Sequence, residues 1–153
     1  MIRMRKTIVS ILAISLCSAA LAVIYALRHN PVLVGFGGDV HSHHSQQILN
    51  PFRSRLPENV AKDFFEVLRG PDCETTLGKM ERNLQRITAT CSEERKYPVM
   101  KSKIEAIGHD NDRILLRYEV YRGGPQGGSK SPFWVWISNL DGQWVVTGYE
   151  TWY

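Results

Sequence analysis

The stretch "PFWVWISNLDGQWVVTGYETW", residues 132–152, decides the fold. Large apolar side chains alternate with other residues on both sides of Asp141 and Gly142, a dipeptide typical of a tight turn between antiparallel strands. The same two-residue period reaches back to residue 99 and predicts strands over residues 99–108, 113–122, 132–140 and 143–152. The turn-forming runs "GHDND", "GGPQGGSKS" and "NLDGQ" separate them, so we expect a four-stranded antiparallel meander.

The residues before this meander follow a helical period instead. Pro57 and Glu58 open the first helix, Gly70 and Pro71 end it, and Asp72 begins a second helical segment. Each segment has one apolar side that must be buried. The sequence therefore predicts an α+β domain over residues 56–153, with two helices packed on the meander.

Both faces of the predicted sheet carry apolar side chains, because successive residues of a strand point to opposite faces. In the second strand, one face carries Ile114, Leu116, Tyr118 and Val120, and the other carries Leu115, Arg117, Glu119 and Tyr121. In the third strand, Phe133, Val135 and Ile137 lie opposite Trp134 and Trp136. One face takes the helices, and the other must be covered, paired with a partner or used for binding.

Residues 7–27, "TIVSILAISLCSAALAVIYAL", contain no charge and no proline. A helix of this length spans about 31 Å, which matches the hydrocarbon core of a bilayer. Three basic residues, Arg3, Arg5 and Lys6, precede the segment and Arg28 follows it, so the positive-inside rule places residues 1–6 in the cytoplasm. We expect a transmembrane anchor with the domain outside.

Two other interpretations of this segment stay open. Small residues near position 20 suit a signal peptidase, which would remove residues 1–22, although the apolar run continues beyond that point. Cys17 suggests a lipid anchor, but Leu16 stands where a small residue is expected. In each case the domain is extracytoplasmic, periplasmic or secreted.

The net charge of +4 does not predict a nucleic-acid partner. Four of the 19 Lys and Arg residues flank the apolar segment, and the remaining 15 balance the 15 Asp and Glu residues. Because the domain has no net positive charge that would release counterions from phosphates, we expect that it does not bind nucleic acid.

Residues 28–55 combine glycine, serine, histidine and proline with scattered apolar residues, and they are interpreted as a flexible tether. His41, His43 and His44, with Asp39 or His29, are candidate zinc or copper ligands. A structural site needs about four ligands fixed by a fold, and the tether predicts no such fold. A solvated linker is the preferred interpretation, and we expect no metal and no cofactor.

Cys73 and Cys91 are a candidate disulfide, as expected for a pair outside the cytoplasm. In one straight helix they would lie about 27 Å apart, whereas a disulfide needs Cα atoms within about 7 Å. A break at Gly78 permits the bond. The alternative is an unbroken helix with two separate buried thiols.

The aromatic residues near the C-terminus are the main indication of function. All four tryptophans fall in the last twenty residues. The candidate residues of an aromatic binding face are Tyr118, Glu119, Tyr121, Trp134 and Trp136. A small domain also uses such side chains as core. We interpret the face as a surface for another envelope protein or for self-association, more consistent with binding than with catalysis.

The alternative function is a small-molecule pocket, either for binding or for an enzymatic reaction, lined by Tyr118, Glu119 and the tryptophans. Acid and base candidates are Glu105, Asp112, Glu119 and Glu150. The loop "GGPQGGSKS" is not interpreted as a phosphate-binding loop, because Ser129 separates Gly128 from Lys130 and no helix follows it.

The order of elements, helices and then a meander ending in "GQWVVTGYETWY", resembles the nuclear-transport-factor-2-like superfamily, a cone-shaped α+β fold. Trp144, Val146 and Tyr149 match the pattern of its last strand. The resemblance covers about residues 56–153 and implies a curved sheet wrapped around its helices. The chain departs from the family in leaving little room for extra strands between the helices, and it carries no catalytic signature of the family. A cystatin-like helix on a sheet is the structural alternative.

Overall fold

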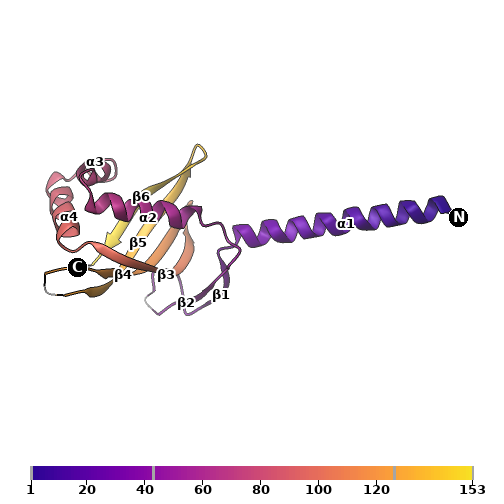
Figure 1. The fold of residues 1–153 in the computed structure, drawn as a ribbon, viewed down its shortest axis with the longest axis horizontal. Coiled ribbons are helices and arrows are strands. Elements are labelled where there is room, and N and C mark those ends of the chain that lie inside the picture. Colours follow the sequence, from indigo (N-terminus) through magenta and orange to yellow (C-terminus); the bar gives the residue numbers. More distant parts are fainter. Residues whose placement is uncertain (1, 43, 126, 153) are drawn as a thin grey trace.

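The computed structural model describes residues 2–42, 44–125 and 127–152. The C-terminal half is a four-stranded antiparallel sheet of β3 (Val99–Asp110), β4 (Arg113–Arg122), β5 (Ser129–Leu140) and β6 (Gln143–Thr151), in the order β3-β4-β5-β6. The predicted meander and the α+β class are confirmed (Figure 1). Asp141 and Gly142 both have positive φ, 52° and 84°, as expected for the tight hairpin turn that they predicted. Strand β5 begins before the predicted Pro132, because Ser129 pairs with Arg122.

Three helices lie on one face of the sheet. Helix α2 (Leu56–Arg69) has Pro57 in its first turn and Gly70 as its C-cap, as predicted. The second predicted helical segment is divided into the short α3 (Cys73–Leu77) and α4 (Leu84–Lys96). Gly78 caps α3, and the Asn83 side chain caps α4 by accepting a hydrogen bond from the Arg86 N–H at 3.2 Å. The chain therefore breaks at Gly78 and resumes its helix at residue 84.

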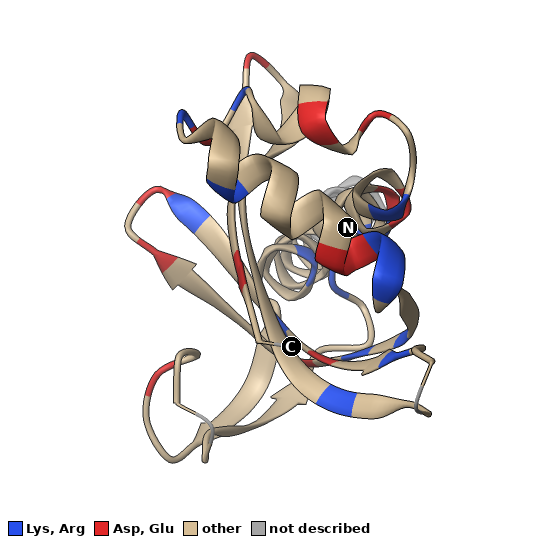
Figure 2. Ribbon diagram, turned by 90° about the vertical axis from the view of Figure 1, so that its left-hand side faces the viewer, with Lys and Arg blue, Asp and Glu red and all other residues tan. Residues whose placement is uncertain are grey.

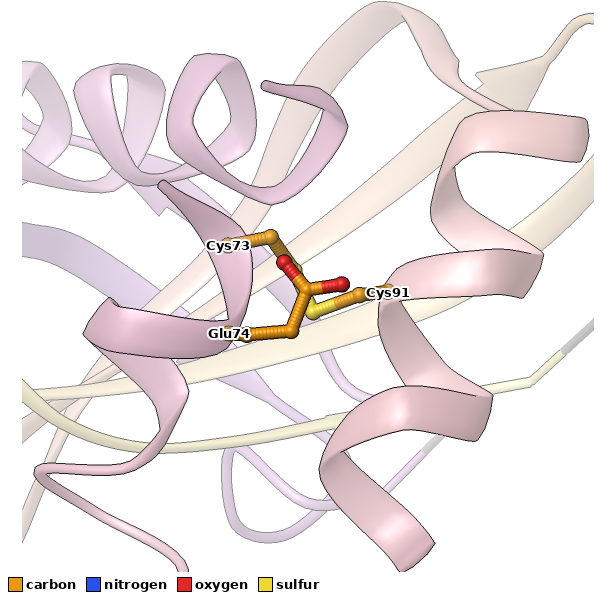
Figure 3. Close-up of side chains that lie close together, drawn as sticks. All are labelled: Cys73, Glu74 and Cys91. Atoms are coloured by element: carbon orange, nitrogen blue, oxygen red, sulfur yellow. A yellow bond between two sulfur atoms is a disulfide. The ribbon is translucent and has the colours of Figure 1, made fainter. Parts of the chain in front are cut away.

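This break allows Cys73 and Cys91 to form a disulfide with a Cα–Cα distance of 5.9 Å. Both cysteines are fully buried, and the bond joins α3 to α4 (Figure 3). The Glu74 carboxylate lies beside the sulfur atoms, but it pairs with Arg95 on α4 at 2.7 Å. Because the two sulfur atoms are bonded to each other, this cluster offers no thiolate to a metal ion.

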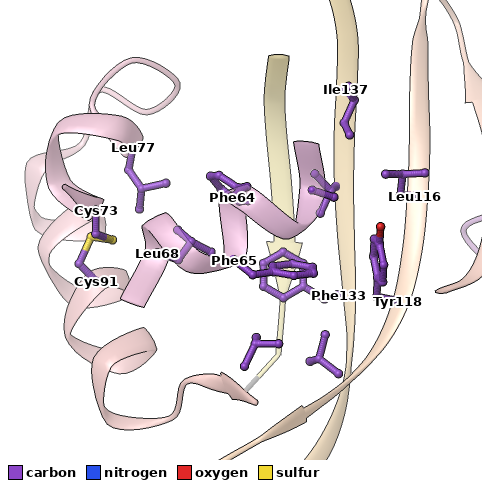
Figure 4. Packing of buried hydrophobic residues seen from close by; sticks show 14 of the residues in the cluster. Phe64, Phe65, Leu68, Cys73, Leu77, Cys91, Leu116, Tyr118, Phe133 and Ile137 are labelled. Atoms are coloured by element: carbon purple, nitrogen blue, oxygen red, sulfur yellow. A yellow bond between two sulfur atoms is a disulfide. The ribbon is translucent and has the colours of Figure 1, made fainter. Parts of the chain in front are cut away.

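The main core lies between the helices and the sheet (Figure 4). Phe65 of α2 meets Phe133 of β5 edge-on at 4.9 Å and Tyr118 of β4 at 5.3 Å, measured between ring centroids. Phe64 contacts Tyr149 of β6 at 5.5 Å. Aromatic pairs in this geometry add about 0.5–1.5 kcal/mol each beyond the area that they bury. These rings fill the inside of the curved sheet.

A buried ion pair attaches α4 to the sheet. Arg122 of β4 donates two hydrogen bonds to Glu94 of α4, each at 2.9 Å, and both side chains are 1% exposed. The same guanidinium also donates to the Tyr97 carbonyl at 2.8 Å and to the Thr151 hydroxyl at 2.7 Å. The bidentate geometry is the strongest form of such a pair.

Helix α1 (Ile2–His29) extends away from the domain (Figure 1). Its part from Ile11 to His29 has a mean hydropathy of 2.1, and its side chains are exposed. Among the described residues, α1 is the helix that is both long enough and apolar enough to cross a membrane. This is consistent with membrane association.

The interpretation of residues 28–55 as a flexible tether is wrong. This stretch contains an antiparallel hairpin of β1 (Val32–Phe36) and β2 (Gln46–Leu49), which lies beside the edge of the large sheet (Figure 1). The Gln47 side chain accepts a hydrogen bond from the Ile107 N–H of β3 at 3.1 Å. Val40 and Asn50 in the same stretch are buried. The segment is part of the folded domain.

The ion pair between Arg122 and Glu94 gives the first prediction. The Glu94→Ala substitution leaves a buried guanidinium without its carboxylate, so it should lower the free energy of unfolding by about 3–5 kcal/mol. The measurement is urea unfolding, with tryptophan fluorescence as the signal. Glu66→Ala is the matched control, since Glu66 pairs with Arg69 on the exposed side of α2 and should cost less than about 1 kcal/mol. Equal costs for the two variants would contradict the anchoring role of Glu94.

Candidate functional site

The face of the sheet opposite the helices, here called the outer face, consists of cross-strand rows set by the register. Ala106, Arg117 and Trp134 form one row, and Gly108, Leu115 and Trp136 form the next. Toward the other end of the strands, Lys101, Tyr121 and Lys130 form a row, and Lys103 and Glu119 form the one beside it. The outer face thus has an apolar half and a basic half.

The apolar half is covered by residues 37–42 together with residues 44 and 45, here called the cover segment. Val40 is 4% exposed and packs against Ala106, Leu115 and Trp134, with Trp136 at the margin. A Cβ atom at Gly108 would lie 3.0 Å from the Val40 side chain, so glycine permits this close approach. The cover segment closes the apolar part of the outer face.

Arg117 fastens the cover segment to the sheet. Its Nη1 donates to the Ser42 carbonyl and, at 3.0 Å, to the Ser45 hydroxyl, while Nη2 donates to the Ser45 carbonyl at 2.8 Å. The Glu105 carboxylate lies 3.5 Å from Arg117 Nε and balances the charge. Arg117 is only 3% exposed, so these contacts replace its hydration.

The basic half stays open and forms a groove of ≈ 490 Å³ lined by Lys101, Lys103, Glu119, Tyr121 and Lys130. A second hollow of ≈ 370 Å³ continues from Lys103 toward the cover segment, where Gln46, Gln47 and Glu105 line it. We call the two together the outer groove. Three lysines and Arg117 face two carboxylates there, so its charge is positive.

Tyr121 is the exposed aromatic residue of the outer groove, at 43% exposure. Its ring lies over the backbone of Gly128, where an added Cβ atom would overlap the Tyr121 hydroxyl. A side chain at residue 128 would therefore displace the ring. Glu119 beside it forms an exposed ion pair with Lys130 at 2.9 Å. The glycine-rich loop thus positions Tyr121.

The structure separates the residues that the sequence grouped together. Glu119 and Tyr121 lie in the outer groove, whereas Tyr118 is 2% exposed in the core on the other face. Trp134 is 5% exposed under the cover segment. Trp136 donates to the Asp110 carboxylate at 2.6 Å. The predicted aromatic surface is therefore mostly covered, and the pocket proposed from Tyr118, Glu119 and the tryptophans is not assembled.

Among the other candidate residues, Asp39, His41 and Glu105 have structural partners. The Asp39 carboxylate accepts hydrogen bonds from the backbone N–H groups of His41 at 2.8 Å and Ser42 at 3.1 Å, which shapes the cover segment. The His41 ring lies 6.2 Å from the Trp136 ring. His44 is exposed, and His43 lies outside the described residues. Glu105 pairs with Arg117, while Asp112 and Glu150 are exposed.

The lysines of the outer groove were not predicted as site residues from the sequence. Lys101 and Lys103 belong to the first predicted strand, and strand alternation places them on one face, whereas Lys130 lies in the predicted loop "GGPQGGSKS". The β3–β4 register places Lys101 opposite Tyr121, and Lys130 reaches Tyr121 only because β5 starts at Ser129, within the predicted loop.

Charged residues of both signs are spread over the rest of the domain (Figure 2). No protein-family model and no curated protein matches this chain. Among solved structures, a designed nuclear-transport-factor-2-like protein superimposes with a TM-score of 0.52 at 11% identity, covering 64% of this chain and 97% of its own. The domain has the nuclear-transport-factor-2-like fold. This likeness concerns the fold alone, and it confirms the resemblance derived from the order of elements.

A protein of Campylobacter jejuni, provisionally named an NTF2-like transpeptidase, also matches. It has 20% identity and a TM-score of 0.37, over 59% of this chain and 95% of its own.

The cover segment gives the second prediction. Val40→Ala removes two buried methyl groups, which should lower the free energy of unfolding by about 1–2 kcal/mol and speed amide hydrogen exchange in residues 37–45. Val34→Ala, in the exposed strand β1, is the matched control and should change neither quantity. The measurement is urea unfolding with hydrogen exchange read by mass spectrometry. Unchanged exchange in the Val40 variant would show that the segment does not depend on this contact.

Tyr118 gives a pH-dependent prediction. Burial raises the pKa of its phenol well above the ordinary value, and the nearby Glu58 carboxylate adds to this, while Arg53 acts in the opposite sense. Because the folded pKa lies above the unfolded one, the contribution to stability is complete below about pH 10 and is lost as the pH rises further. The urea concentration at the midpoint of unfolding should drop as the pH rises above about 10, here called the alkaline fall, and Tyr118→Phe should make this drop smaller.

At neutral pH the same variant should be as stable as the parent, or more stable by up to about 1 kcal/mol, because the Tyr118 hydroxyl has no hydrogen-bond partner among the described residues. Tyr121→Phe, an exposed position, should keep the parent's alkaline fall. A Tyr118 variant that follows the parent at every pH would refute the burial argument.

Proposed function

We propose that this chain is a single-pass membrane protein whose extracytoplasmic domain binds an acidic, extended segment of another envelope protein in the outer groove. Residues 1–6 lie in the cytoplasm, α1 crosses the bilayer, and residues 30–153 stand outside. The domain acts as a binding or assembly module. The observation that carries this proposal is the position of Tyr121 between lysines, on a part of the outer face that the described residues leave open.

The proposed location rests on charge and on redox chemistry. Arg3, Arg5 and Lys6 precede the apolar part of α1, and such an excess of basic residues marks the cytoplasmic side. The disulfide between Cys73 and Cys91 is typical of a compartment outside the reducing cytoplasm. Both observations support the same topology.

The proposed ligand class follows from the chemistry of the outer groove. Lys101, Lys103 and Lys130 attract carboxylates, and their flexible stems fit a rim that does not require one fixed geometry. Tyr121 offers a flat apolar ring with a polar tip, which is a common anchor at protein interfaces. The groove continues along the strands toward Gln47, a shape that suits an extended chain better than a compact molecule.

A small-molecule site is the second candidate function. The space between the helices and the sheet is filled by Phe65, Tyr118 and Phe133, so the outer groove is the candidate site for such a ligand as well. Glu119 is the carboxylate available there, and its ion pair with Lys130 is exposed and breakable. Bound small molecules, rather than a protein partner, would distinguish this function.

The test is photo-crosslinking of the full chain in the membranes of cells that make it. A photoreactive phenylalanine analogue at position 121 should form an adduct with a second protein. The adduct should fall about tenfold when Lys101→Glu and Lys103→Glu are added, because reversing two charges beside an acidic ligand costs more than about 1.4 kcal/mol. The same analogue at exposed Leu140, on the β5–β6 turn, is the control and should form no charge-dependent adduct.

The intact mass of the chain isolated from the membrane fraction completes this experiment. The chain should retain residues 1–22 and weigh two hydrogens less than its reduced form. An adduct at position 121 that ignores both lysine changes would reject the proposed ligand class, and a fully reduced chain would reject the location. An adduct of twice the chain's own mass would identify the partner as a second copy.

A further inference from the structure

The junction between α1 and the domain contains a groove of its own, of ≈ 670 Å³. Ile24 and Leu27 of α1 form its apolar wall together with Phe52 and Leu56. Arg28 and Arg55 also line it. Phe52 is 69% exposed and Leu56 is 57% exposed, so two large apolar side chains face outward beside two guanidinium groups.

The position of this junction groove relative to α1 is fixed by buried hydrogen bonds. The fully buried Asn50 donates from Nδ2 to the Leu27 carbonyl at 2.5 Å and to the Asn30 carbonyl at 2.8 Å. The Ser54 N–H donates to the Arg28 carbonyl at 3.2 Å. These bonds satisfy carbonyls at the helix end that have no partner within the helix. The domain therefore meets α1 at a defined place.

That place is the level at which a bilayer ends. If residues 7–27 span the hydrocarbon core of about 30 Å, Leu27 lies at its outer boundary and Arg28 lies among the lipid headgroups. Tyr25, stacked on His29 at 4.1 Å, lies at the same level, where amphipathic rings are enriched in membrane proteins. Phe52 and Leu56 line the same groove as Ile24 and Leu27 and so reach the acyl chains.

The charge of the junction groove is positive. Glu58 is shared between Arg53 at 2.7 Å and Arg55 at 3.0 Å, and Arg28 is exposed on the opposite wall. One carboxylate among three guanidinium groups leaves two positive charges at the headgroup level. Guanidinium groups bind phosphate oxygens with two parallel hydrogen bonds.

We propose that the junction groove seats an anionic phospholipid of the leaflet that faces the domain. Its phosphate lies between Arg28 and Arg55, and one acyl chain follows Ile24, Leu27 and Phe52. The lipid completes the contact between α1 and α2 and holds the domain against the membrane surface. This inference rests on the proposed function in one respect, namely that α1 stays in the membrane.

The test is native mass spectrometry of the full chain in detergent micelles with added phosphatidylglycerol or phosphatidylcholine. The first phosphatidylglycerol should bind at least about fivefold more tightly than phosphatidylcholine, and the double variant Arg28→Gln with Arg55→Gln should lose this preference. Arg69→Gln with Arg86→Gln is the matched control, because it removes the same charge from exposed ion pairs of α2 and α4. The control should keep the preference.

Phe52→Ser should weaken binding of both lipids, since it removes apolar contact without changing charge. Equal binding of the two lipids by the parent chain would overturn the inference, and so would an equal loss in the junction pair and in the control pair. A dimer that forms in place of lipid adducts would overturn it too.

Extraction of membranes with alkaline carbonate separates this failure from a failure of the proposed function. If the chain stays in the membrane but shows no arginine-dependent lipid, only the lipid site is wrong. If carbonate releases a chain lacking residues 1–22, the membrane anchor fails and the lipid site fails with it.

Discussion

A sheet with two apolar faces must be covered on both, and this constraint organises the whole chain. A two-layer domain covers one face with its helices, as α2 and α4 do here, and it leaves the second face exposed to water. Leaving Leu115 and Trp134 exposed would cost about 2 kcal/mol or more for each side chain. The chain solves this by bringing the cover segment back over the outer face. The stretch between α1 and α2 thereby becomes a third layer over part of the sheet.

Buried arginines hold these layers in register. Arg122 fixes α4 to the inner face, Arg117 fixes the cover segment to the outer face, and Arg53 ties the end of the hairpin segment to α2. Each of them donates to a backbone carbonyl as well as meeting a carboxylate. An apolar contact tolerates sliding, whereas a planar guanidinium with several fixed acceptors does not. The arginines therefore define where each layer sits, while the aromatic core supplies most of the area buried.

The sequence predicted the parts of the fold that follow from local periodicity. Strand alternation located the meander, and the Asp141 and Gly142 turn fixed its last hairpin. The break at Gly78 was found from the geometry that a disulfide between Cys73 and Cys91 requires. The hairpin of β1 and β2 was missed because its strands have only five and four residues, too short to show a period. Its buried residues, Val40 and Asn50, act through contacts far away in the sequence.

The same difference, between local periodicity and contacts distant in the sequence, explains which candidate site residues were placed correctly. Alternation separated the two faces of β4 correctly, so Glu119 and Tyr121 were assigned to the outer face together. Nothing local indicates that Val40 covers Trp134 while Tyr121 stays open, because that choice depends on where the chain returns after α1. Residues 37–47, "GGDVHSHHSQQ", suggest a metal site or a linker when the sequence is taken alone. The described residues of this stretch instead include those that cover the apolar half of the outer face. The contact between Val40 and Trp134 therefore determines the structural role of this stretch, which its composition does not indicate.

The stretch between α1 and α2 also connects the two surfaces proposed for binding. Gln46 and Gln47 of β2 line one end of the outer groove, and Asn50, immediately after β2, caps the end of α1. Only a few residues separate these contacts, and all of them belong to one paired, partly buried element. A flexible tether would let the groove face any direction above a membrane. Because Asn50 fixes this element to α1 and Arg117 fixes it to the sheet, the outer groove instead keeps one orientation relative to α1.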